Sequence, residues 1–168
     1  MILQYFKRKE NKDKQLAQDF YKKILYLSNS ILKKNSFFKE SNYNTSFEIV
    51  SIILIIYIKL NIKFNIKNYK NVNEHLINHF VLDLDDSLRS KGIGDMSIGK
   101  YVKTYIKKFY FRLSKFPYET DKIDQNHFLD YLQNFELISS ERQIEAAKVF
   151  LENFNNISAS YKVELNTN

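Results

Sequence analysis

Apolar residues recur at intervals of three and four along most of this chain, the spacing of helices that each bury one face. Segments with this spacing are residues 13–34, 73–91, 96–116, 122–135 and 140–156, and residues 45–60 are apolar on nearly all sides. The pattern predicts an all-α fold of about six helices, packed as a single domain around residues 45–60. Residues 1–12 are expected to form an N-terminal extension, and residues 157–168 a loose C-terminal tail.

The central segment contains the longest apolar run, IVSIILIIYI, from Ile49 to Ile58. A membrane span needs about 20 apolar residues, so this run is too short and indicates a buried core helix. Its β-branched residues also suit a strand, but buried strands usually extend over only about four to eight residues. Thr45 and Glu48 have the spacing of a capping box, which predicts that the helix starts at Thr45.

Polar and helix-breaking residues predict the connections between the helices. Residues 35–46, NSFFKESNYNTS, are expected to form a polar loop, and Pro117 is expected to end the fourth helix. Ser140 and Gln143 have capping-box spacing, which predicts that the sixth helix starts at Ser140.

Composition narrows the chemistry that the chain can support. It has 168 residues with 3 Gly, 1 Pro and no Cys. The scarcity of Gly and Pro argues against a turn-rich β fold, and the lack of Cys excludes disulfides, cysteine zinc sites and thiol catalysis. The net charge of +7 suits RNA, a ribosome or an anionic membrane, but the abundance of Lys, Asn and Ile throughout the chain explains it equally well.

All 3 glycines lie between Gly92 and Gly99, in the segment RSKGIGDMSIGKYVK. A phosphate-binding loop would need Ser or Thr after Lys100, where the chain has Tyr101. Both this loop and a dinucleotide-binding motif would follow a strand, whereas an amphipathic helix precedes the glycines here. Neither nucleotide-binding motif is therefore expected.

The glycine segment instead predicts a corner between two helices. Gly92 is expected to end one helix with a positive φ angle, and Gly94 to provide the bend. Asp95 is expected to cap the following helix, and Gly99 to allow a neighbouring element to approach closely.

The same region resembles the signature of the ubiquinol–cytochrome c chaperone family. The family's stretch has Asp-x-Asp, then Leu-Arg, then Gly-Val-Gly-Asp, then a hydrophobic-small-Val-Gly-Lys run. Residues 83–103, DLDDSLRSKGIGDMSIGKYVK, match it at Asp83, Asp85, Leu88, Arg89, Gly92, Gly94, Asp95, Gly99 and Lys100. Two weaker matches flank this stretch. Residues 47–60, FEIVSIILIIYIKL, resemble the family's Phe-Glu helix without its usual His, and residues 109–112, FYFR, resemble Phe-Tyr-Gly-Arg with Phe111 in place of glycine.

This resemblance implies a non-enzymatic chaperone for assembly of the cytochrome bc1 complex. Mitochondrial relatives resemble ribosome-associated chaperones that hold newly made cytochrome b together with a small partner protein. The expected client is cytochrome b or another bc1 subunit, without cofactor or small-molecule substrate. The short chain, with no convincing presequence, resembles the bacterial relatives. A cytoplasmic location with peripheral contact at the inner membrane is expected, or the mitochondrial matrix in a eukaryote.

Two groups of residues are candidate binding surfaces. The resemblance singles out an acidic corner as a partner-binding site, made of Asp83, Asp85, Arg89, Gly92, Gly94 and Asp95. The outer face of the fourth helix is expected to be basic and to bind a partner, RNA or lipid, through Lys100, Lys103, Lys107, Lys108 and Arg112. A solvated face of a lysine-rich protein is the alternative for this second group.

One cluster raises the question of an enzyme. His75, His79 and Asp83 are spaced four apart on one predicted helix, where two histidines can share a metal ion. The segment HLINH lacks the Glu of zinc proteases, and no nucleophile–base pair is evident, so no metal and no catalytic residue are expected. Two other functional classes stay open: a ribosome- or RNA-binding module that uses the basic helix, and an enzyme built on this cluster.

Overall fold

The computed structural model describes the backbone of residues 2–34, 36–117, 123–135 and 137–166, and side-chain surroundings between residues 11 and 162 of those ranges. The helices are α1 (Ile2–Lys34), α2 (Tyr43–Lys63), α3 (Tyr69–Ser90), α4 (Asp95–Lys115), α5 (Gln125–Leu132) and α6 (Gln143–Asn166), with a 3-10 turn, η1 (Ser140–Arg142), before α6. Within these ranges the remaining regular pairing is one isolated antiparallel bridge, between Phe38 and Ile138. The predicted all-α single domain is confirmed.

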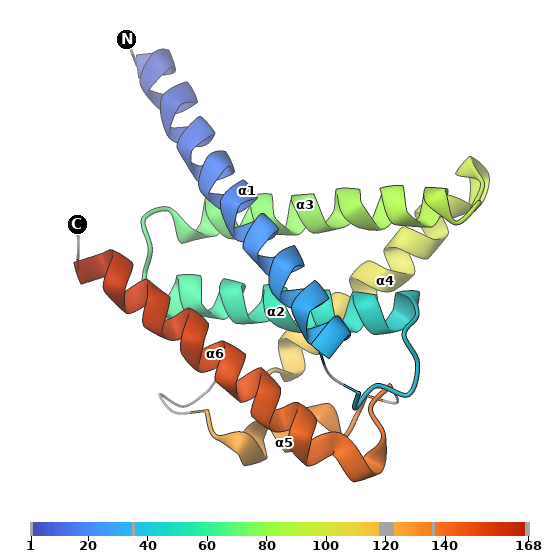
Figure 1. Ribbon diagram of the computed structural model, residues 1–168. Helices are drawn as coiled ribbons and strands as arrows, with labels where there is room; N and C mark the ends of the chain where they lie inside the picture. The colour runs from blue at the N-terminus through green and yellow to red at the C-terminus, as the bar shows by residue number, and fades with distance from the viewer. Residues whose placement is uncertain (1, 35, 118–122, 136, 167–168) are drawn as a thin grey trace.

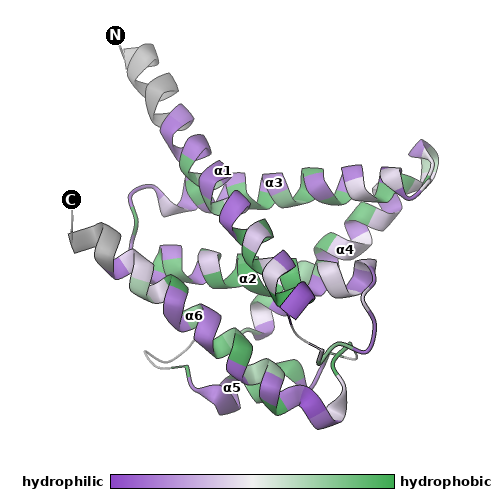
Figure 2. Cartoon of the chain, in the orientation of Figure 1, coloured by the Kyte–Doolittle hydropathy of each residue, from purple (hydrophilic) through white to green (hydrophobic). Residues whose placement is uncertain are grey.

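The helix α2 forms the centre of the fold, as its apolar sequence predicts. It packs against α1, α3, α4 and α6, and α5 packs against α6 (Figure 1). The outer helices carry hydrophobic and hydrophilic residues on different faces, whereas α2 is buried along nearly its whole length (Figure 2). By length and composition α2 is apolar enough to cross a membrane, but 78% of its most apolar window is buried inside the fold. We therefore interpret α2 as the core helix.

The first and last helices are longer than the apolar pattern indicates. Helix α1 begins at Ile2 rather than near residue 13, and α6 continues to Asn166, so the predicted extension and loose tail are largely helical. Neither segment contains Gly or Pro, so no residue in it breaks a helix. Tyr161 shows the anchoring of α6 directly, because it is buried and its hydroxyl donates to Oδ1 of Asn61.

Two predicted helix starts are wrong because other residues cap the helices. Asn42 is the N-cap of α2, and its side chain accepts a hydrogen bond from the Thr45 amide at 3.0 Å. Glu48 therefore does not form the predicted capping box, and its side chain has other partners. At the other end of the chain, residues from Ser140 form the 3-10 turn whose N-cap is Ser139, so Ser140 does not cap α6.

The loop before α2 is less polar than predicted, because Phe37 is fully buried within it. Its ring packs against Phe150 of α6 at a centroid distance of 6.4 Å. The backbone of this loop pairs with residues 137–139: the Lys39 amide donates to the Leu137 carbonyl at 2.9 Å, and the Ser139 amide to the Phe37 carbonyl at 3.2 Å. The loop is thereby fixed to the segment between α5 and α6.

Candidate functional site

The corner between α3 and α4 contains most of the residues that the sequence singles out. Gly92 follows α3 with a φ angle of 84°, in the left-handed region that favours glycine. Its amide donates to the Arg89 carbonyl at 2.8 Å, and the Ile93 amide donates to the Leu88 carbonyl at 3.3 Å. These bonds form a Schellman motif, and the predicted role of Gly92 as the helix terminator is confirmed.

Gly94 lies in the bend as predicted, but neither Gly94 nor Gly99 needs to be glycine. Gly94 is the N-cap of α4 with φ −71° and ψ 155°, a conformation open to any residue, and Asp95 is the first helical residue instead of the cap. A Cβ atom on Gly94 or Gly99 would meet no atom within 4 Å, so neither glycine serves a close approach. Of the three glycines, only Gly92 is required by the backbone conformation.

Arg89 joins the two helices at this corner. Its Nε atom donates to Oδ2 of Asp85 at 2.5 Å, and its Nη1 atom donates to Oδ1 of Asp95. Asp95 also lies in the first turn of α4, where the helix dipole favours a carboxylate. Solvent still contacts these side chains, with exposed fractions of 45% for Arg89, 32% for Asp85 and 85% for Asp95. The corner thus presents charges that a partner can contact.

Asp83 is separated from this cluster and faces α1. The hydroxyl of Tyr21, in α1, donates to Oδ2 of Asp83 at 2.9 Å. Burial and the neighbouring Asp83 carboxylate raise the pKa of Tyr21 above its ordinary value, so the phenol stays protonated and remains a donor. The predicted acidic corner therefore divides into a turn centred on Arg89 and a separate carboxylate that contacts α1.

His79, one turn before Asp83 on α3, packs against α1. The ring of His79 stacks on Tyr21, with centroids 5.6 Å apart and an interplanar angle of 22°. Burial lowers the pKa of His79, which favours the neutral ring. Among the described residues, no group of three His, Asp or Glu side chains is arranged to hold a metal ion.

The predicted basic face of α4 contains lysines and an arginine in two different settings. Lys100, Lys103 and Lys107 are exposed, and none has an acidic partner among the described side chains. Lys108 and Arg112 turn toward the core, and Arg112 is only 9% exposed. Arg112 lies three residues after Phe109 and four before Phe116, so helical geometry places it on the apolar side. Its assignment to the outer face is therefore wrong.

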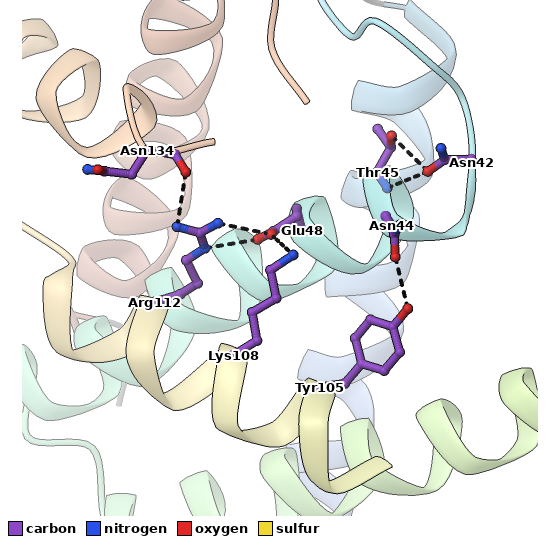
Figure 3. A network of polar contacts seen from close by, with 8 residues as sticks. All are labelled: Asn42, Asn44, Thr45, Glu48, Tyr105, Lys108, Arg112 and Asn134. Carbon is purple, nitrogen blue, oxygen red and sulfur yellow. Dashed lines mark hydrogen bonds and ion pairs between the residues drawn. The ribbon is translucent and has the colours of Figure 1, made fainter. Parts of the chain in front are cut away.

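Arg112, Lys108 and Glu48 form a buried ionic network between α2 and α4 (Figure 3). Arg112 donates from Nη2 to Glu48 Oε1 at 3.1 Å and from Nε to Oε2 at 3.2 Å, a bidentate pair. Lys108 Nζ lies 2.6 Å from Glu48 Oε1. Arg112 also donates to the Asn134 carbonyl at 3.4 Å, and its guanidinium lies 3.8 Å from the Phe135 ring centroid. The network connects α2, α4 and the end of α5.

This network explains why two distant motifs occur in one chain. Glu48 belongs to the Phe-Glu motif of α2, and Arg112 ends the FYFR motif of α4, 64 residues later. The structure brings them together as one ion pair, with Phe47 beside Phe80 and Phe80 beside Phe109. Phe111, where the motif has glycine, is 54% exposed, so its larger side chain meets solvent rather than a neighbouring helix.

Two hollows share Tyr43 in their lining, and the second of them reaches the α3–α4 corner. The first has a volume of about 90 Å³ and is lined by residues of α1, α2 and α3, including Tyr21, Phe80 and Asp83. The second has a volume of about 300 Å³, and Leu88 and Tyr101 line it from α3 and α4. Sequence reasoning missed Tyr21 and Tyr43, because their partners lie on other helices and no local spacing relates them.

Comparisons with known proteins agree with the motifs. The family described as ubiquinol–cytochrome C chaperone matches residues 37–146, which include α2, α3, α4 and α5. The crystal structure of the Cbp3 homolog from Brucella abortus matches with a TM-score of 0.71, covering 94% of this chain and 88% of that chain at 20% sequence identity. That likeness shows the fold. No curated protein matches the chain. With about two thirds of its length matched, the chain belongs to the ubiquinol–cytochrome c chaperone family, whose members are assembly factors of the cytochrome bc1 complex.

Proposed function

We propose that this protein is an assembly chaperone of the bc1 complex that holds newly made cytochrome b until later subunits join. The family match over residues 37–146 carries this proposal. The matched region includes both the buried Glu48–Arg112 pair and the α3–α4 corner. The helices that carry the proposed binding surface, α3 and α4, therefore lie inside it.

The proposed mechanism is binding without chemistry, so the protein needs no cofactor and no small-molecule substrate. Support comes from large apolar side chains that solvent contacts on α4: Met96, Tyr101, Tyr110 and Phe111, with exposed fractions between 47% and 103%. Exposed apolar groups of this kind are typical of protein or membrane contact surfaces. The hollow lined by Leu88 and Tyr101 lies at the same corner and would receive client side chains.

We place the protein in the cytoplasm, at the inner membrane where the client is inserted, or in the matrix of a mitochondrion. A ribosome or a small partner protein would contact the same surfaces. Lys100, Lys103 and Lys107 favour an anionic neighbour, because they are exposed and have no acidic partner among the described residues.

The test is a deletion strain complemented with the wild-type gene. Loss of the protein should lower the bc1 complex and the cytochrome b absorbance, while cytochromes of other complexes serve as the internal control. Normal cytochrome b in the deletion strain would refute the proposal. Purification of the tagged protein with cytochrome b from growing cells tests the finer point, that cytochrome b is the client.

A ribosome- or RNA-binding module is the second candidate. Lys100, Lys103 and Lys107 favour it, because they are exposed and have no acidic partner among the described residues. Replacement of Lys100, Lys103 and Lys107 by Glu should abolish ribosome co-sedimentation, and binding of the wild type should weaken steeply with salt. The matched control replaces Lys12, Lys33 and Lys34, which are exposed on α1, by Glu. Equal loss in both triple variants would indicate non-specific attraction by net charge alone.

A further inference from the structure

The smaller hollow, which we name the Asp83 pocket, is lined by both apolar and polar side chains. Phe47, Phe80 and Leu84 line it with apolar side chains, and Tyr21, Tyr43 and Asp83 add polar groups to the lining. The volume is about 90 Å³. A water needs roughly 10–15 Å³ by this measure, so the pocket has room for several waters or for the end of one side chain. It is too small for a helix or a large ligand.

No cation among the described residues balances the charge of Asp83. Its hydrogen bond from Tyr21 is neutral, and no cationic side chain forms an ion pair with it among the described residues. Glu48 has two cations as partners, and Asp85 has Arg89. A half-buried carboxylate beside apolar side chains is strongly stabilised when a partner protein supplies a cation to pair with it.

The hydroxyl of Tyr43, unlike that of Tyr21, is unsatisfied. The Tyr43 hydroxyl is buried and has no hydrogen-bond partner among the described residues. Burial raises the pKa of Tyr43 to about 12, so its hydroxyl is neutral near pH 7 and is able to accept a hydrogen bond. The Tyr43 ring already has the Lys91 ammonium 4.2 Å from its centroid, so this ring can interact with cations.

We infer that the Asp83 pocket binds a single cationic side chain, lysine or arginine, of a partner protein. The carboxylate supplies the charge, the aromatic walls take the alkyl chain and the face of the cation, and the Tyr43 hydroxyl accepts one N–H donor. Charge complementarity excludes an anionic occupant, and the small volume limits the site to one side chain.

If the proposed function holds, the Asp83 pocket binds a basic side chain of the client. Loops of membrane proteins on the cytoplasmic or matrix side are enriched in Lys and Arg next to apolar segments. Such a loop would place a cation in the Asp83 pocket and apolar residues on the neighbouring hollow at Leu88 and Tyr101. The pocket would then recognise a bc1 subunit by its basic loops and leave its haem site untouched.

A binding experiment on the purified full chain tests the pocket without any client. The probe is n-butylguanidinium chloride, titrated while amide chemical shifts are recorded, with n-butanol in matched sodium chloride as the uncharged control. Saturable shifts at residues 43–47 and 80–87 are expected for the guanidinium, with binding at least tenfold weaker for n-butanol. Equal binding of n-butanol, or no saturable shift at these residues, would overturn the inference.

Three variants locate the interaction. Asp83→Asn keeps an acceptor for the Tyr21 hydroxyl but removes the charge, and should weaken probe binding at least tenfold. Ser87→Lys adds an ammonium one turn after Asp83 on α3, in the order that favours an ion pair, and should block the pocket even if Asp83→Asn perturbs the fold. Asp86→Asn, at an exposed position, is the matched control and should bind as wild type. Unchanged binding in Ser87→Lys would contradict the assignment.

The same variants separate this inference from the proposed function in cells. If the wild type restores the bc1 complex and both pocket variants restore it equally, the pocket does not bind the client, although the chaperone function stands. If the deletion leaves the bc1 complex intact, the proposed function fails, and the probe titration alone decides whether the pocket is a cation site.

Discussion

Glu48 and Arg89 are each the centre of an ionic cluster that joins α4 to another helix, but the two clusters lie in opposite environments. Around Glu48, the carboxylate is 4% exposed and the Arg112 side chain 10%. Around Arg89, the exposed fractions are 45% for the guanidinium and 85% for Asp95. Both clusters include residues of motifs of the same family, so residues from family motifs do not all have the same role.

The difference lies in the cost of removing the charges from water. A buried ion pair is strongly coupled to the fold, because loss of one partner leaves the other charge without solvent or counter-charge. An exposed pair exchanges its contacts with water and contributes little to stability. The Glu48 cluster therefore fixes the angle between α2 and α4, whereas the Arg89 cluster leaves charges available at the corner for a partner.

The largest expected effect follows from removal of Glu48. Glu48→Ala leaves Arg112 buried beneath Phe135 without its bidentate partner, which should lower the free energy of unfolding by about 3–5 kcal/mol. Chemical denaturation followed by circular dichroism measures it. The double variant Glu48→Leu with Arg112→Met is the control, since apolar replacement of a whole buried pair is often neutral. A cost below about 1 kcal/mol for Glu48→Ala would show that the network is effectively solvated.

Glycine at the corner should have the next largest effect. Gly92→Val places a β-branched residue at a φ angle of 84°, which should cost more than about 1 kcal/mol of stability. Gly94→Ala is the matched control, because Gly94 has an ordinary φ angle and open space around it. Thermal unfolding of both variants measures the difference. Equal midpoints would mean that the turn relaxes without strain.

Much of this fold follows from the sequence, because its helices are amphipathic and its core helix is apolar on all sides. The six helical segments and the left-handed Gly92 are predicted by local spacing alone. The ends of α1 and α6 are missed, since a helix continues past its apolar stripe when no residue breaks it. Asn42 replaces Thr45 as the cap of α2, because several polar residues there compete for the role.

The candidate site is predicted less completely, because its contacts join residues far apart in the chain. Tyr21 and Asp83 are 62 residues apart, and nothing in either local sequence indicates their hydrogen bond. Arg112 is different, because its position between Phe109 and Phe116 on the helix already indicates the apolar face. The prediction that all the basic residues of α4 share one face is wrong at Arg112 for this reason. Its buried partner, Glu48, is known only from the structure.

The Tyr21–Asp83 pair lies between the two extremes and should show a smaller effect that depends on pH. Tyr21 is 7% exposed, and its pKa is raised above the ordinary value of 10.0, chiefly by burial. The folded state therefore keeps a proton that the unfolded chain releases above about pH 10, so stability from this group is present below that pH and is lost as pH rises.

Tyr21→Phe should cost about 1 kcal/mol near pH 7, and its difference from wild type should shrink from pH 10 upward. Denaturant midpoints between pH 7 and pH 11 measure this difference. Tyr26→Phe is the control, because Tyr26 is 75% exposed. A difference that stays constant across this range would show that the Tyr21 phenol ionises as readily in the folded state as in the unfolded chain.

The smallest expected effect is at Arg89, where the comparison is most direct. Arg89→Gln and Arg112→Gln make the same chemical change on two helices, yet the first removes an exposed guanidinium and the second a buried one. Arg89→Gln should leave the thermal midpoint unchanged, because Asp85 and Asp95 regain water when their partner is lost. Arg112→Gln should lower it clearly, because among the described residues Glu48 then has only Lys108 as a cationic partner. Added salt sharpens the test, since it screens an exposed cluster and hardly affects a buried one. If both variants lose stability equally and without salt dependence, the corner is a structural ion pair, and the charges at Asp85, Arg89 and Asp95 would not be free to meet a partner.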